Sequence, residues 1–179
     1  ISFQVSFDPQ ENTVDYPNTV EVDGVSPGGE GVDHQSTVNI NLSSVMSASI
    51  DLTKHASSVV ADDDNPGSFL VTYDLELNNT GDVPIENVNI EDNLTTAYGV
   101  QGTDWTFDSA PAFIGASYGI GLSLAPYDGG TNDDLFAANQ VLPVDGEVQV
   151  RFTVRFAPRE VGGVTVTDYA NIATASGTD

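Results

Sequence analysis

The chain has 179 residues, 39% of them hydrophobic, so it is long and apolar enough to fold around a core. It carries 27 acidic residues against four basic ones, a formal net charge of −23, which argues against nucleic acid and anionic membranes as partners because both would repel it. The sequence has no cysteine for disulfides or thiolate chemistry, and no apolar run approaches the roughly 18 residues of a membrane-spanning helix.

Alternation of apolar and polar residues, the pattern of a half-buried strand, recurs along most of the chain. Its clearest occurrences, in chain order, are residues 1–7, 36–42, 68–77, 87–90, 147–156 and 164–175. Clusters of Gly, Pro, Asn and Asp separate these segments, as turns require. Only residues 92–98 suggest helical turns, with Asp92 or Asn93 as the cap. The sequence therefore predicts an all-β fold, an antiparallel immunoglobulin-like sandwich with an extra N-terminal group of strands.

Two parts of the sequence resemble each other. Residues 1–9 (ISFQVSFDP) match residues 150–158 (VRFTVRFAP), and a Tyr-x-Asn motif follows each copy, at Tyr16 and at Tyr169. The spacing corresponds to a repeat period of about 150 residues. We therefore predict that residues 44–179 form a complete repeat unit, with an insert at about 99–124 that is either a further hairpin or a surface loop.

Residues 1–43 are then either the terminal strands of a preceding unit or strands that dock on a neighbour. Because a sheet of two or three strands is marginal by itself, this group needs a partner to cover it. The partner is either the second unit of the same chain or a neighbouring molecule that accepts the strands at an open sheet edge.

Several short motifs follow one another in a characteristic order. They are the strand with Lys54, the VTY strand at 71–73, the NNTGD turn at 78–82, the strand that ends at Asp92, and the YANIA strand at 169–173. In this order they resemble the conserved immunoglobulin-like repeat of large bacterial and archaeal surface proteins, over residues 48–95 and 127–176.

The resemblance implies an immunoglobulin-like sandwich in a long secreted or cell-wall protein, without a defined catalytic activity. We therefore expect an extracellular or cell-surface structural module, part of an adhesin stalk or a self-assembling filament, and not an enzyme. Its expected partners are neighbouring copies of the same module or the same protein.

Two acidic loops are candidate calcium sites. The aspartates concerned are Asp62, Asp63 and Asp64 in the first loop, and Asp128, Asp133 and Asp134 in the second. Ca²⁺ takes six to eight oxygen ligands, which carboxylates clustered on turns can supply. The sequence thus predicts at least one bound Ca²⁺ that rigidifies loops or junctions. The alternative is a pair of solvated acidic loops whose repulsion is screened by a salty medium.

Lys54, the single lysine, falls on the first predicted strand of the complete unit, and Asn171 falls on a late one. An amine and an amide of this kind can join in an isopeptide bond when both are desolvated beside a buried carboxyl group. Glu91 or Asp92 would supply that carboxyl group. The alternative is a surface lysine and an asparagine that satisfies a strand end.

Aromatic residues gather in the Gly-rich insert, among them Trp105 and Tyr118. If exposed, they would stack on sugar rings or form a patch for a partner, which makes a module that binds carbohydrate or another ligand the second functional hypothesis; if buried, they belong to the core. Three N-x-[ST] sequons, at Asn41, Asn78 and Asn93, are candidate glycosylation sites in an exported protein.

Overall fold

The computed structural model describes residues 4, 6, 15–42, 46–115 and 121–179 and divides the chain into two compact units, Ile1–Ser47 and Ala48–Asp179. The boundary expected between residues 43 and 44 thus lies between 47 and 48. The strand predicted at residues 1–7 falls outside the described residues except for Gln4 and Ser6, and Tyr118 falls outside them as well. The two units are treated one at a time.

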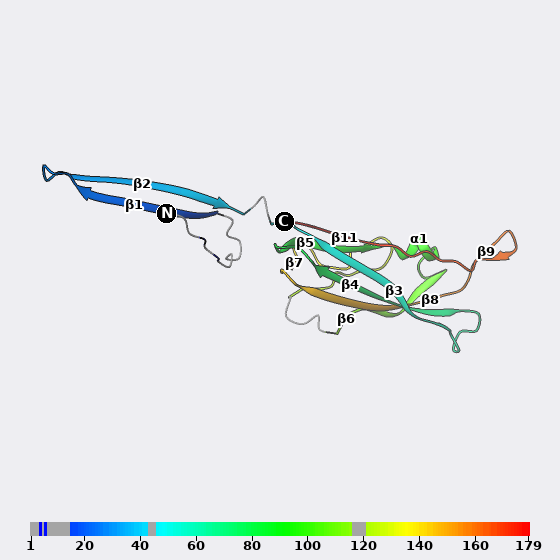
Figure 1. Cartoon of the computed structure of the whole chain (residues 1–179). Coiled ribbons are helices and arrows are strands. Elements are labelled where there is room, and N and C mark those ends of the chain that lie inside the picture. The colour runs from blue at the N-terminus through cyan, green and yellow to red at the C-terminus, as the bar shows by residue number, and fades with distance from the viewer. Residues whose placement is uncertain (1–3, 5, 7–14, 43–45, 116–120) are drawn as a thin grey trace. The chain divides into compact units, whose positions relative to one another are not determined.

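The described part of the first unit is a long antiparallel hairpin of β1 (Asp15–Val25) and β2 (Gly31–Asn41) (Figure 1). The strands pair over their whole length, from Asp15 opposite Asn41 to Val25 opposite Gly31. Hydrogen bonds within residues 26–30 close the turn between them. Every residue of the two strands except the half-buried Tyr16 is exposed. The hairpin therefore has no core of its own.

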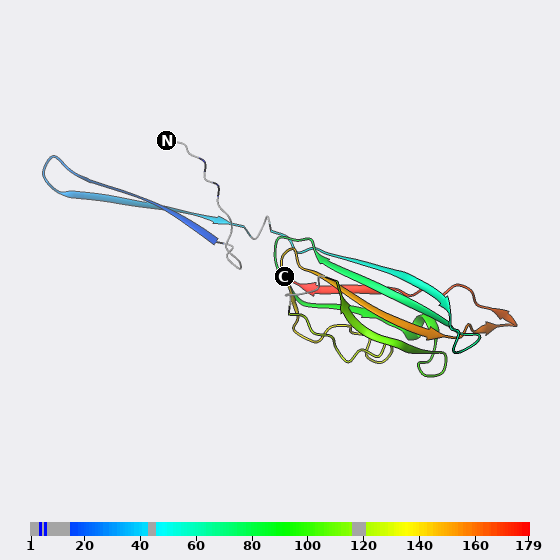
Figure 2. The ribbon, with the colours of Figure 1, turned by 90° about the horizontal axis from the view of Figure 1, so that it is seen from below.

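The second unit contains a four-stranded antiparallel sheet in the order β3-β4-β8-β6. Its strands are β3 (Ile50–Ala61), β4 (Phe69–Asn79), β8 (Glu147–Phe156) and β6 (Trp105–Ile114). A three-stranded antiparallel sheet has β5 in the centre; its strands are β11 (Ala173–Thr178), β5 (Ile85–Asp92) and β7 (Val141–Leu142). In Figure 2 the long strands of both sheets run along the length of the unit.

One cluster of buried side chains joins the two sheets. On β4 the buried residues alternate with partly buried ones from Val71 to Leu77, and on β8 they alternate from Val148 to Phe156. Val88 and Ile90 of β5 belong to the same cluster. The two sheets therefore form a sandwich around a shared core, and the prediction of an all-β antiparallel fold is confirmed. The immunoglobulin type of the sandwich stays a prediction.

The remaining elements are short. A two-stranded sheet of β9 (Glu160–Val161) and β10 (Val164–Thr165) projects from one end of the unit in both views (Figures 1 and 2). The helix α1 (Leu94–Tyr98) follows β5, and the Asn93 side chain caps it by accepting a hydrogen bond from the Thr96 backbone N–H. Within the described parts of the chain no helix is long and apolar enough to cross a membrane.

The segment expected as an insert, residues 99–124, contains β6, which pairs with β8 at the edge of the four-stranded sheet. Trp105 at the start of β6 is only 2% exposed. The described part of this segment is thus neither a separate hairpin nor only a surface loop, because it supplies a strand and a large core side chain to the sandwich.

Candidate functional site

Three polar side chains occupy inward positions that strand alternation would give to apolar residues. On β3, Lys54 lies on the same side as Ile50 and Leu52, which pack against the core. The other two are Asp92 and Asn171. Since successive side chains of a strand point to opposite faces, Lys54 follows the apolar side of β3 inward.

Asp92 lies on β5 of the other sheet, and Asn171 lies in the segment that leads into β11, the strand paired with β5. Asp92 ends β5 and continues the buried series of Val88 and Ile90. Asn171 precedes β11 by two residues, and in the register of the two strands Ala173 lies opposite Asp92. β11 also contacts β3. The topology therefore brings the first and last strands of the unit to the same carboxyl group.

Lys54 and Asp92 form a buried ion pair. The Lys54 Nζ donates to Asp92 Oδ2 over 2.6 Å, and the two side chains are 9% and 0% exposed. The amine also lies 4.9 Å from the ring centroid of Tyr73. On the other side of the aspartate, the Tyr127 hydroxyl donates to the Asp92 backbone oxygen over 2.8 Å. Aromatic rings and backbone thus separate the pair from water.

The Asn171 amide lies against the same two neighbours. Burial raises the pKa of both the Asp92 carboxyl and the Tyr73 hydroxyl, and the nearby Asn171 amide partly opposes this rise in each. Even so, neither its nitrogen nor its oxygen has a hydrogen bond of standard geometry, and Asp92 Oδ1 also has none. Buried polar atoms without a partner are costly and therefore rare. The amide and the free carboxyl oxygen are thus the least satisfied polar groups of this site.

The environment favours the uncharged forms of the pair. Burial is the largest influence on the Lys54 amine and lowers its pKa, against the attraction of Asp92. Burial is likewise the largest influence on Asp92 and raises its pKa, against the attraction of Lys54. Both shifts favour transfer of a proton from the amine to the carboxyl group. The site therefore holds an amine, a carboxyl group and a carboxamide together.

Of the two residues expected to supply the carboxyl group, Glu91 and Asp92, it is Asp92 that contacts Lys54. Glu91 is exposed, because it lies on the opposite side of β5 from Asp92, and its backbone forms a bridge with that of Asp134. The distinguishing signal was in the sequence. Asp92 has the same parity as Val88 and Ile90, whereas Glu91 does not.

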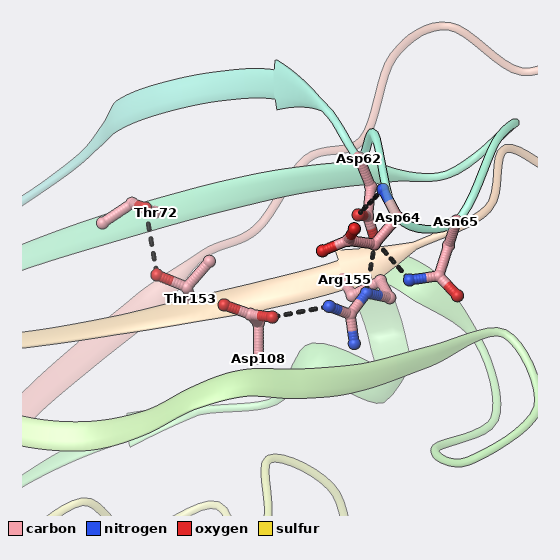
Figure 3. A network of polar contacts seen from close by, with 7 residues as sticks. All are labelled: Asp62, Asp64, Asn65, Thr72, Asp108, Thr153 and Arg155. Atoms are coloured by element: carbon pink, nitrogen blue, oxygen red, sulfur yellow. Dashed lines mark hydrogen bonds and ion pairs between the residues drawn. The ribbon is translucent and has the colours of Figure 1, made fainter.

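A second polar network surrounds Arg155 (Figure 3). From β8, the guanidinium donates to Asp62 Oδ2 over 2.5 Å and to Asp108 Oδ1 over 2.6 Å. Asp62 also accepts from the Asn65 side chain, over 2.9 Å. The Arg155 hydrogen bond is the main reason why the pKa of Asp62 is lowered. This arginine ties the β3–β4 loop to β6, and sequence analysis did not single it out.

The aspartates that were expected to bind calcium have separate neighbours. Asp62 is paired with Arg155, while Asp63 and Asp64 are exposed. Asp128 accepts from the backbone N–H groups of Gly130 and Asn132, Asp133 from Asn93, and Asp134 from Asn89. In the described ranges no three acidic or histidine side chains converge as a metal site. Calcium binding stays a prediction.

Trp105 is not available to stack on a ligand. Its indole N–H donates to the Gly99 backbone oxygen over 3.0 Å, and its ring packs edge-on against Phe107 at 5.3 Å. Burial in the core explains the position of this aromatic side chain, so its assignment to a ligand site is corrected.

The three sequons differ in their surroundings. Asn41 is exposed on β2, where its side chain donates to Asp15 over 2.6 Å. Asn78 is half-buried and donates to Glu76 over 3.0 Å. Asn93 caps α1 and donates to Asp133. In all three residues the side-chain nitrogen that a glycan would occupy donates a hydrogen bond, and glycosylation stays a prediction.

Comparison with known proteins does not identify a family. No protein-family model matches the chain, and no curated protein matches it. Among solved structures, the chitinase ChiA74 from Bacillus thuringiensis aligns with 90% of this chain at 16% sequence identity and a TM-score of 0.28. The alignment spans 19% of the chitinase chain, so the two proteins differ greatly in extent.

Proposed function

We propose that the chain is a structural repeat module of an extracellular surface protein, from an adhesin stalk or a self-assembling filament, in which the β1–β2 hairpin is covered by another copy of the module. The observation that carries this proposal is the exposed apolar face of the hairpin. The all-β sandwich supplies a rigid body of the kind that such proteins repeat.

The hairpin is amphipathic across its width. One face carries five aliphatic side chains that are 43% to 64% exposed: Val20, Val22, Val32, Val38 and Ile40. The opposite face is polar and acidic; it includes Asp15, Glu21, Asp23 and Asp33. An exposed apolar face with a polar reverse side is typical of an interaction surface. Burial of the exposed parts of these side chains would favour association.

The internal repeat supports a copy of the same module as the covering partner. Tyr16 in the hairpin corresponds to Tyr169 in the second unit. Tyr169 packs against Phe156 with ring centroids 4.8 Å apart and lies against the core. Tyr16 lies on the apolar face of the hairpin, opposite Ile40. The Tyr-x-Asn motif of the hairpin thus corresponds to a motif that, in the second unit, packs against the core of a sandwich.

Charge sets the conditions for such an association. Copies with a net charge of −23 repel each other, and salt weakens this repulsion. Ca²⁺ bound to the acidic loops would act in the same direction. We therefore expect assembly of the chain to increase with ionic strength.

Light scattering after size-exclusion chromatography, together with electron microscopy, tests the proposal over a range of protein and salt concentrations. The wild-type chain should form dimers or longer assemblies. Val38→Asp, on the apolar face, should abolish them. Its neighbour Thr37→Asp adds the same charge to the polar face and should leave them intact. A wild-type chain that stays monomeric at high protein and salt concentrations would contradict assembly through this face.

A further inference from the structure

The cluster of Lys54, Asp92 and Asn171 has a composition that a structural salt bridge does not explain. A simple buried ion pair would be complete with Lys54 and Asp92, whose closest atoms are 2.6 Å apart. The structure adds a carboxamide with two unpartnered, buried polar atoms and leaves one Asp92 oxygen unpartnered beside it. The amide shares both the Asp92 carboxyl and the Tyr73 side chain as neighbours with the lysine.

We propose that Lys54 and Asn171 are joined by an intramolecular isopeptide bond, and that Asp92 is the general acid of its formation. The bond would connect β3, the first strand of the second unit, to the segment that leads into β11, its last strand. The inference concerns this unit alone and does not depend on how copies of the chain associate.

The reaction starts with transfer of a proton from the Lys54 ammonium to the Asp92 carboxylate. The neutral Nζ then attacks Cγ of Asn171, while the protonated Asp92 donates to the amide oxygen and stabilises the negative charge that develops there. The leaving nitrogen takes up a proton from the attacking amine, and the C–N bond of the carboxamide breaks. One amide bond forms, one breaks, and one ammonia leaves, with no oxidant, reductant or cofactor.

The surroundings of the cluster suit this chemistry. Burial lowers the pKa of Lys54 and raises that of Asp92. Both shifts favour the neutral amine and the protonated carboxyl group that the attack requires. Tyr73, Tyr127 and the sandwich core limit access of water, which would otherwise stabilise the charged forms of the amine and the carboxyl group. Lys54 lies on β3 and Asn171 lies two residues before β11, so folding brings the two groups together and meets the entropy cost of doing so.

A bond at this position would also alter how the unit responds to force. Tension applied to the two ends of the second unit would pass from β3 to the Asn171 segment through the bond. Residues 55–170 would then be excluded from extension. This property fits a module that carries load, although the bond can be tested without any mechanical measurement.

Intact-mass spectrometry of the denatured, purified chain tests the proposal directly. The wild-type mass should be lower than the calculated mass by one ammonia. Digestion with an endoproteinase specific for acidic residues should release a branched peptide that contains both Lys54 and Asn171. Lys54→Arg keeps a cation beside Asp92 but removes the nucleophilic amine, and Asn171→Ala removes the acceptor. Both variants should have their full calculated masses.

Asp92→Asn and Glu91→Gln form a matched pair that tests the general acid. Each variant converts one of two adjacent carboxyl groups to an amide, but only Asp92 contacts the lysine. Asp92→Asn should retain its full calculated mass, and Glu91→Gln should still lose one ammonia. Circular dichroism and cooperative melting show whether each variant is folded. If Asp92→Asn does not fold, the peptide map of the wild type and the mass of Lys54→Arg still decide the question.

Two results would overturn the inference. One is a wild-type mass equal to the calculated mass, with Lys54 and Asn171 recovered in separate linear peptides; the cluster would then be a buried ion pair beside an unsatisfied amide. The other is a loss of ammonia that maps to a different asparagine, as cyclisation within the backbone would produce. Loss of ammonia in Asp92→Asn as well would remove Asp92 from the reaction.

Discussion

The strands β2 and β8 have similar sequence patterns and opposite surroundings. β2 reads GVDHQSTVNIN and β8 reads EVQVRFTVRF; apolar and polar residues alternate along the whole of β8 and from Thr37 to Asn41 of β2. In β8 the alternate residues from Val148 to Phe156 are buried, whereas every residue of β2 is exposed. Alternation therefore determines which side of a strand is apolar but not which element covers that side.

The difference arises from what lies next to each strand. β8 pairs with β4 and β6, and β5 from the second sheet contributes to the core that covers its apolar face. Among the described residues of its unit, β2 pairs with β1 alone. The four cationic side chains, Lys54, Arg151, Arg155 and Arg159, all belong to the second unit. The sandwich thus neutralises part of its own charge and buries its own apolar face, while the hairpin does neither.

Truncation of an apolar side chain in each unit tests this contrast with the largest expected effect. Phe152 of β8 is 0% exposed and contacts Tyr73 and Phe107. Phe152→Ala should lower the free energy of unfolding by about 3–5 kcal/mol, because it removes a large side chain and leaves a cavity. Val38→Ala on the hairpin should change it by no more than about 0.5 kcal/mol in the monomer. Denaturant unfolding measures both, and comparable losses would show that the hairpin has a core after all.

Removal of a buried polar side chain should have the next largest effect. The Asn79 amide, in a residue that is 2% exposed, donates to the backbone oxygens of Val83, Leu142 and Pro143 and accepts from the Gly81 N–H. It thereby connects β4 to β7 and to the turn before β5.

Asn79→Ala should therefore cost about 2–3 kcal/mol of unfolding free energy, because several backbone groups lose their buried partner. Asn78→Ala is the matched control, since Asn78 is half-buried and its side chain donates to Glu76. Its cost should stay near or below about 1 kcal/mol. Equal losses in denaturant unfolding would show that the hydrogen bonds of Asn79 contribute little.

The sequence predicted the individual strands and the helix better than it predicted which strands pair with each other. The alternation of Glu147–Phe156 is strong enough to define β8 and its buried face, and of the two expected helix caps, Asp92 and Asn93, it is Asn93 that caps α1. β6 was missed because its burial pattern departs from strict alternation, and its pairing with β8 shifts register twice. Register shifts of this kind depend on the partner strand and cannot be read from one segment.

The candidate site was predictable only in part, because the sequence indicates which residues stand out on a strand but not which loop lies over it. Lys54 is the single lysine and lies on an alternating strand, and Asn171 has a repeated motif around it, so both could be singled out. Parity along β5 would also have given Asp92 in place of Glu91. By contrast, the pairing of Arg155 with Asp62 depends on the position of the β3–β4 loop over β8, and no local pattern indicates it. The loop of Asp62, Asp63 and Asp64 was therefore predicted as a metal site, whereas in the structure the buried Asp62 carboxylate is paired with Arg155.

Acid should destabilise the sandwich by disrupting the ion pair of Asp62 and Arg155. Since the pKa of Asp62 is lowered by Arg155, its stabilising contribution is fully present above the unfolded pKa of about 3.9 and is lost as the pH falls through the lower folded value. Arg155→Met should melt at a lower temperature than the wild type at pH 6. The difference should shrink as both are acidified below pH of about 3. Glu21→Gln on the hairpin should leave the acid limb unchanged, and a gap that persists in acid would indicate lost packing instead.

Removal of the hairpin should have the smallest effect on the sandwich. The second unit has its own core of buried residues, and deletion of residues 1–47 removes none of them. Because no core residue of the remaining unit is lost, its free energy of unfolding should change by less than about 0.5 kcal/mol. Deletion of residues 173–178, which form β11, should by contrast prevent cooperative folding, because the strand pairs with β5 and its Ala173 and Ala175 pack against the core. A large loss of stability on deletion of residues 1–47 would mean that the apolar face of the hairpin packs on the sandwich of its own chain. A second copy of the module would then not be needed to cover this face.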